Sequence, residues 1–195
     1  MTYTSIDSVK HVLGIPPDDL LDDHILEIAL AAAGEAINRH CFRRFVVPTA
    51  TSTVVVEASE GNYIRVPDIA SEQGLGIEVE VTPGVFSPLA GASLLLTPTD
   101  APLEGRPYTA IVVRGATLAP GQLVRVTARF GWSAVPAAVR QAALLLTTRL
   151  MKRKDSPLGI QGAPEMGQMR VTRVDPDVAQ LLDPLRRMDA TGLAL

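Results

Sequence analysis

The N-terminal part of the chain carries apolar side chains at helical spacing. Ser5 suits a helix N-cap and Gly14 a C-cap, which predicts a short helix between them. Asp18 and Asp19 are suited to cap a longer helix that runs to about His40. Two apolar rows follow this second helix, namely Leu21, Ile25, Ile28 and Ala32 in one row and Leu26, Leu30, Ala33 and Ile37 in the other. The pattern predicts a helix that packs inside a bundle.

From about Val46 to Phe130 the pattern changes to short β-prone runs. Ile77 to Val81 and Val124 to Ala128 alternate apolar with polar side chains, as half-buried strands do. Other β-prone runs span residues 53–56, 63–66 and 110–113, and turn pairs lie at Gly61-Asn62, Pro83-Gly84 and Pro120-Gly121. Because no helical pattern separates these runs, we predict an antiparallel sheet, arranged as a small sandwich or barrel.

A helical pattern returns after Pro136 and ends in a basic cluster. Its apolar stripe consists of Val139, Ala143, Leu146 and Leu150. Lys152, Arg153 and Lys154 lie at the negative end of the helix dipole, where cations are favoured. These three cations are either a solvated helix end or a candidate contact for DNA phosphates.

The segment from Pro157 to Met188 has a different character. Gly159 to Gln168 shows no periodicity, which predicts a loop that a partner orders, whereas Asp175-Pro176 opens a short helix that Pro184 interrupts. The candidate docking residues are flexible apolar, β-prone or basic: Met166, Met169, Arg170, Val171, Arg173 and Val174. The alternative is a segment that wraps its own bundle, with Leu181, Leu182 and Leu185 filling a groove.

These patterns together predict an α+β fold with three parts. A helical core comprises residues 1–46 and 132–156, and an antiparallel β domain over residues 47–131 is inserted into it. Residues 157–195 form a C-terminal docking segment with a short strand at 171–174 and a short helix.

Composition and charge exclude several functional classes. A formal net charge of −3 argues against non-specific nucleic-acid binding, which needs a positive surface. Aromatic residues make up only 4% of the 195 residues, so the core must be aliphatic. The single cysteine, Cys41, rules out an internal disulfide and suits a reducing compartment. No run approaches the roughly 18 to 20 apolar residues of a membrane span, so we expect a soluble protein made in the cytoplasm.

Catalytic and metal-binding motifs are missing from the sequence. It contains no Walker-type phosphate loop, no G-x-S-x-G elbow and no H-E-x-x-H zinc motif. The histidines lack metal-ligand spacing, and a zinc site using His40, Cys41 and a distant carboxylate competes with a buried thiol beside surface imidazoles. We therefore expect no enzyme activity, no metal and no cofactor.

Several segments of the sequence have a recognisable pattern, of which the most specific is Phe130-Gly131-Trp132 followed by Val135 to Leu146. The others are Asp7 to Ile15, Ile37 to His40, Arg43 to Phe45, Arg149 to Gly159 and Val174 to Val178. Together these segments resemble the phage head-tail connector (adaptor) family related to the small connector of HK97-type phages. The resemblance covers nearly the whole chain and is weakest between about Val47 and Gln122, so the β domain is an elaboration.

The resemblance implies a structural ring subunit of a virion neck, made in the bacterial host cytoplasm. About twelve copies would dock beneath the portal protein, extend the DNA channel and bind the next neck or tail ring. DNA would pass without sequence-specific binding, and no membrane would be involved. The alternatives are another neck ring, such as a stopper or tail terminator, and a binding module whose sheet exposes an aromatic cluster. Trp132, the only tryptophan, is predicted to be packed at the sheet-to-helix junction instead.

Overall fold

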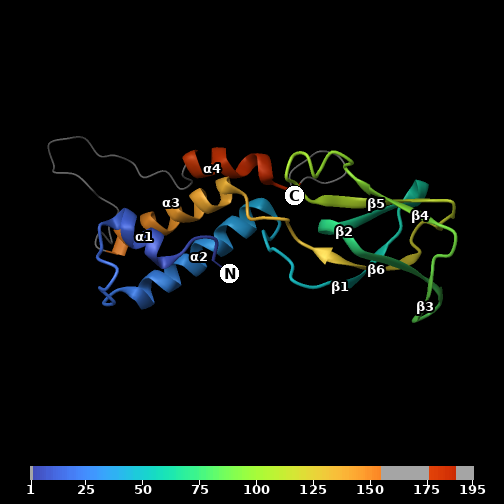
Figure 1. Cartoon of the computed structure of the whole chain (residues 1–195), viewed down its shortest axis with the longest axis horizontal. Helices are drawn as coiled ribbons and strands as arrows, with labels where there is room; N and C mark the ends of the chain where they lie inside the picture. The colour runs from blue at the N-terminus through green and yellow to red at the C-terminus, as the bar shows by residue number, and fades with distance from the viewer. Residues whose placement is uncertain (1, 155–175, 188–195) are drawn as a thin grey trace. The chain divides into compact units, whose positions relative to one another are not determined.

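The computed structural model describes residues 2–154 and 176–187 (Figure 1). These residues form four α-helices and one six-stranded sheet, so the predicted α+β fold is confirmed. The chain divides into two compact units. The helical unit comprises Met1–Arg44 and Pro136–Leu195, and the β unit comprises Phe45–Val135.

Helix α1 (Ile6–Leu13) begins and ends as its local sequence predicts. The Ser5 hydroxyl accepts the Ser8 N–H at 3.2 Å, which satisfies one of the free donors of the first turn. Gly14 ends the helix in the left-handed conformation, with φ 71°, and its N–H donates to the His11 carbonyl.

Helix α2 (Asp23–Cys41) begins later than the sequence suggests. Its N-cap is Asp22, and the predicted caps Asp18 and Asp19 lie in the preceding loop. Only one of its two apolar rows is buried, the row of Leu26, Leu30, Ala33 and Ile37. The other row, which comprises Leu21, Ile25, Ile28 and Ala32, is exposed in the described structure. Packing inside the bundle therefore accounts for half of the apolar surface of this helix.

Helix α3 (Ala137–Lys154) packs against α1, α2 and α4. Val139 and Ala143 of its predicted stripe are buried, whereas Leu146 is half-buried and Leu150 is 38% exposed. Thr148, which the pattern predicts on the outer side, is buried because three helices surround α3. Among residues 2–154 and 176–187, none of the helices combines the length and apolar character that crossing a bilayer requires.

Helix α4 (Pro176–Leu182) continues into the 3-10 turn η2 (Asp183–Leu185). The start at Pro176 and the interruption at Pro184 agree with the prediction for this helix. Val178 and Leu182 are buried, which fastens α4 to the helical unit.

The β unit is an antiparallel sheet with strand order β1-β6-β2-β5-β4, and β3 pairs with β2. The strands are β1 (Ser52–Glu57), β2 (Tyr63–Thr82), β3 (Val85–Pro88), β4 (Ser93–Thr97), β5 (Tyr108–Arg114) and β6 (Leu123–Phe130). The short 3-10 helix η1 (Glu60–Asn62) lies between β1 and β2. The predicted antiparallel pairing is confirmed, although the sequence pattern did not identify β3 and β4.

Strand β2 joins two segments that the sequence predicts as separate strands, 63–66 and 77–81. Its register shifts between Arg65 and Ile69 and again between Ser71 and Gly76, so the intervening residues form bulges and not a turn. The first part pairs with β5 and the later part with β6. Both parts contribute to one aliphatic core with β4, β5 and β6, so the sheet curves around that core.

Trp132 closes the end of the β unit. It is 1% exposed, it packs on Phe45 with ring centroids 5.0 Å apart, and its Nε1–H donates to Asp68 Oδ2 at 3.0 Å. A Cβ added to Gly131 would lie 2.2 Å from the Val46 carbonyl oxygen, so this position requires glycine. The predicted burial of Trp132 is confirmed, and Trp132 is not available to the sheet as an exposed aromatic contact.

We expect Trp132→Ala to lower the free energy of unfolding of the β unit by about 3 to 5 kcal/mol, because it empties a fully buried indole site. Trp132→Phe is the matched control, since it retains an aromatic ring and loses the donor to Asp68 with only part of the indole volume, so its loss of stability should be smaller. Denaturant unfolding followed by circular dichroism measures both variants. A loss under 1 kcal/mol for the alanine variant would contradict this assignment.

Candidate functional site

The six predicted docking residues Met166, Met169, Arg170, Val171, Arg173 and Val174 lie outside the described residues. Lys152 and Arg153 are exposed in the last turn of α3, and Lys154 is its final residue. The structure therefore brings together two of the candidate DNA contacts as an exposed basic helix end. Their role remains a prediction.

Residues 176–187 pack on their own bundle. Leu182 is 1% exposed, and Leu181 and Leu185 are half-buried. His40 Nε2 lies 2.8 Å from Asp183 Oδ1, and the Arg187 N–H donates to the Cys41 carbonyl at 2.9 Å. These contacts attach α4 and η2 to the C-terminal end of α2, as the wrapping alternative expects for this part of the segment.

Cys41 and His40, the pair considered for a zinc site, have structural partners. The Cys41 thiol is buried and lies 3.9 Å from the Leu182 carbonyl oxygen, and burial raises its pKa to about 11. A thiol of this kind stays protonated at neutral pH and is a poor metal ligand or nucleophile. Within the described ranges, no group of three His, Cys, Asp or Glu side chains is placed to hold a metal ion.

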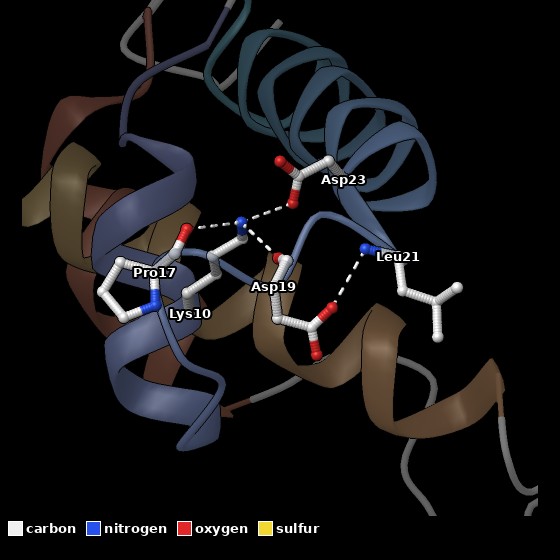
Figure 2. Close-up of polar contacts among 5 residues, drawn as sticks. All are labelled: Lys10, Pro17, Asp19, Leu21 and Asp23. Atoms are coloured by element: carbon white, nitrogen blue, oxygen red, sulfur yellow. Dashed lines mark hydrogen bonds and ion pairs between the residues drawn. The ribbon is translucent and has the colours of Figure 1, made fainter.

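The loop between α1 and α2 is organised by a buried ammonium group, which Figure 2 shows. Lys10 is 2% exposed, and its Nζ donates to the carbonyl oxygens of Pro17 and Asp19 at 3.3 and 2.7 Å. The same Nζ lies 2.6 Å from Asp23 Oδ1. These three oxygens replace the water that the ammonium group loses on burial. The Asp19 carboxylate accepts the Leu21 N–H at 3.0 Å, so this loop has a defined conformation.

The loop between α1 and α2 exposes apolar side chains to solvent. Leu20 is 70% exposed and Leu21 is 88% exposed, although both lie within a few residues of the buried Lys10 group. Along α2 the exposed row continues through Ile25 and Ile28, at 38% and 57%. We call the row Leu21, Ile25, Ile28 and Ala32 the α2 stripe. An exposed apolar row that continues from a loop onto a helix is typical of a protein-protein contact.

Charged side chains surround the α2 stripe unevenly. The exposed carboxylates Asp18, Asp19, Glu27 and Glu35 lie in the loop and along α2. Helix α3 has no acidic residue between Ala137 and Lys154, and it exposes Arg140, Lys152 and Arg153. The helical unit thus has exposed carboxylates in the loop and along α2, an exposed Arg39 near the end of α2, and a basic surface on α3.

Sequence reasoning did not identify the α2 stripe or Lys10 as special. The signal for the stripe was present, because two parallel apolar rows cover a wider arc than one packing partner buries. Lys10 gave no comparable signal, since a lone lysine in an amphipathic helix is usually exposed.

Comparison with known proteins supports the fold. No protein-family model matches the chain, and neither does any curated protein. One similar chain belongs to a solved structure described as the neck of an empty GTA particle, computed with C6 symmetry. Its sequence is 23% identical and its TM-score is 0.56, and the match covers 97% of this chain and 92% of that chain. A chain in the virion of a native gene transfer agent (GTA) particle is 22% identical with a TM-score of 0.54, over 96% and 90%. The chain therefore shares its fold, over nearly its full length, with chains of these particles.

We expect Lys10→Met to destabilise the helical unit by about 2 to 4 kcal/mol, because it leaves Asp23 and two carbonyl oxygens without their cation. Helical circular dichroism in a denaturant titration measures the change, while Trp132 fluorescence follows the β unit in the same sample. Lys152→Met is the control, since Lys152 is exposed. An unchanged helical midpoint in Lys10→Met would show that the buried ammonium group is dispensable.

Proposed function

We propose that this chain is a structural subunit of the neck of a tailed phage or phage-like particle, and that it acts by assembly and not by catalysis. The observation that carries the proposal is the fold shared over 97% of the chain with a chain of a GTA particle neck. The connector resemblance of the Phe130-Gly131-Trp132 region points in the same direction. The structure supplies a physical reason for that motif, since a Cβ at Gly131 would clash with the backbone and Trp132 is fully buried.

Within the neck, we assign the chain the role of a head-tail connector (adaptor) ring. In this role about twelve copies dock under the portal protein, extend the DNA channel and bind the next neck or tail ring. The symmetric neck structure supports a ring, because it was computed with C6 symmetry and a ring of twelve is compatible with that symmetry. A stopper or tail-terminator ring is the alternative position in the same neck.

The portal contact is assigned to the segment that contains Met166, Met169, Arg170, Val171, Arg173 and Val174. Helix α3 ends at Lys154 and α4 begins at Pro176, and both helices pack within the helical unit. The two ends of the intervening segment are therefore attached to the same rigid body. A tethered segment of β-prone and methionine side chains can add to a strand edge or fill an irregular groove on a portal subunit.

Particles produced without this chain should lack tails and retain packaged DNA poorly, because the joint beneath the portal would be missing. Electron microscopy counts the tailed particles, and nuclease protection measures the retained DNA. Supplying the wild-type chain in trans is the control. Tailed, infectious particles that form without the chain would contradict the neck function. If the purified chain binds tail ends and not portal, the terminator role would be favoured.

Substitution of the docking segment should abolish portal binding without unfolding the chain. The variant combines Met166→Ser and Met169→Ser with Arg170→Glu and Arg173→Glu, and it keeps the buried Val178 and Leu182 of α4. We expect at least about tenfold weaker binding to purified portal at an unchanged melting temperature. The matched control is Arg65→Glu with Arg114→Glu, two exposed arginines of the β unit. Loss of thermal stability with retained portal binding would instead favour the wrapping alternative.

A further inference from the structure

The α2 stripe is an apolar surface that the described residues of the chain leave uncovered. Leu21 and Ile28 are 88% and 57% exposed, and Leu20 beside them is 70% exposed. Single exposed aliphatic side chains are common on protein surfaces, but here they follow one another along a loop and a helix. This continuity indicates an area that is buried in an assembly.

The Lys10 group makes the stripe a rigid surface. Its bonds to Pro17, Asp19 and Asp23 hold the loop that carries Leu20 and Leu21, as Figure 2 shows for Leu21. A partner that binds these leucines does not have to order the loop first, so less binding free energy is lost to conformational entropy.

The carboxylates near the α2 stripe favour a partner surface that carries positive charge. Exposed carboxylates lie at Asp18 and Asp19 before the stripe and at Glu35 three residues after Ala32, whereas the exposed cation Arg39 lies beyond the C-terminal end of the stripe. Helix α3 has the opposite character, since it lacks acidic residues and exposes Lys152 and Arg153 at its C-terminal end. Near its start, α3 also leaves Ala138 and Leu145 half-buried and Gln141 exposed, whereas Thr148 farther along the same row is buried. The chain thus carries an apolar row preceded by carboxylates and a basic helix end of opposite charge.

The directions of the two helices allow copies to meet at the same level. Helices α2 and α3 lie side by side and run in opposite directions (Figure 1). The acidic start of α2 and the basic end of α3 are therefore at the same end of the bundle. Copies related by rotation about an axis along the bundle would place the acidic end of one beside the basic end of the next.

We propose that the α2 stripe of one copy binds α3 in the next copy of the same chain, through the accessible side chains Ala138, Gln141 and Leu145 and the exposed basic end at Lys152 and Arg153. The contact is heterologous, and repeated contacts of this kind close into a ring when the rotation permits. This inference rests on the proposed neck function and specifies the surfaces through which the ring forms. It assigns Lys152 and Arg153 to the neighbouring subunit and not to DNA.

Cross-linking of single-cysteine surfaces tests the pairing. One protein carries Ile28→Cys and a second, distinguished by a tag, carries Leu145→Cys, while the native Cys41 is buried and does not react. A short bismaleimide applied to the mixture at up to about 1 mM protein captures even weak contacts. We expect the mixed Ile28→Cys and Leu145→Cys product to dominate. A predominant Ile28→Cys homodimer, or no product between copies, would overturn the proposal.

Charge and apolar variants test the same contact independently. Ile28→Lys should weaken self-association at least about tenfold in sedimentation experiments, because it places a cation against the basic side of α3. Leu103→Lys is the control, since Leu103 is 91% exposed in a loop of the β unit. Lys152→Glu combined with Arg153→Glu should weaken self-association as well. If this double variant loses only DNA retention in particles, the basic end contacts DNA and the charge pairing is wrong.

Particle assembly separates this inference from the neck function. Particles supplied with Ile28→Lys should resemble particles that lack the chain, whereas particles supplied with Leu103→Lys should be tailed. If the chain is required for tailed particles but Ile28→Lys supports normal assembly, the self-docking surface is wrong and the neck function stands. An intrachain cross-link from Ile28→Cys to Met166→Cys in monomeric protein would also overturn the proposal, since the chain would then cover its own stripe.

Discussion

The buried ammonium group of Lys10 is the constraint on which the arrangement of the helical unit depends. A cation removed from water needs oxygen ligands, and the chain supplies two loop carbonyls and the Asp23 carboxylate. These contacts hold Pro17 and Asp19 beside α1, and α2 begins at Asp23, the residue that supplies the carboxylate. They also turn Leu20 and Leu21 outward, so the interaction that stabilises the loop determines which apolar side chains remain available to a partner.

The two units use apolar residues in different ways. The β unit buries its aliphatic side chains in one core and closes one end with Trp132, which leaves it self-contained. In the helical unit, α2 has an apolar arc wider than its neighbours cover, and the uncovered half lies between carboxylates. An exposed apolar surface of this kind favours aggregation of an isolated subunit. In the proposed ring, the neighbouring copy would cover it. The proposed assembly contacts therefore lie in the helices.

Two side chains that could react or bind a metal, His40 and Cys41, have structural roles in this chain. His40 pairs with Asp183, and the Cys41 thiol is buried under Leu182, so both residues help to hold η2 and α4 in place. With α4 attached there, the proposed portal segment begins and ends on the helical unit.

Local sequence by itself determined the parts of this protein whose causes are local. The caps of α1, Ser5 and Gly14, follow from backbone geometry, and the alternation around Val124 predicts a strand because successive side chains face opposite sides of a sheet. The burial of Trp132 was predictable because an indole of that size seldom remains exposed at a junction. Tertiary structure alone decided the start of α2, the continuity of β2 and the exposure of Ile28, since each depends on a partner distant in the chain or missing from it. The same holds for the candidate site: Met166 and Arg173 were suggested by composition, but Lys10 and the α2 stripe acquire their roles only when the loop, α2 and α3 pack together.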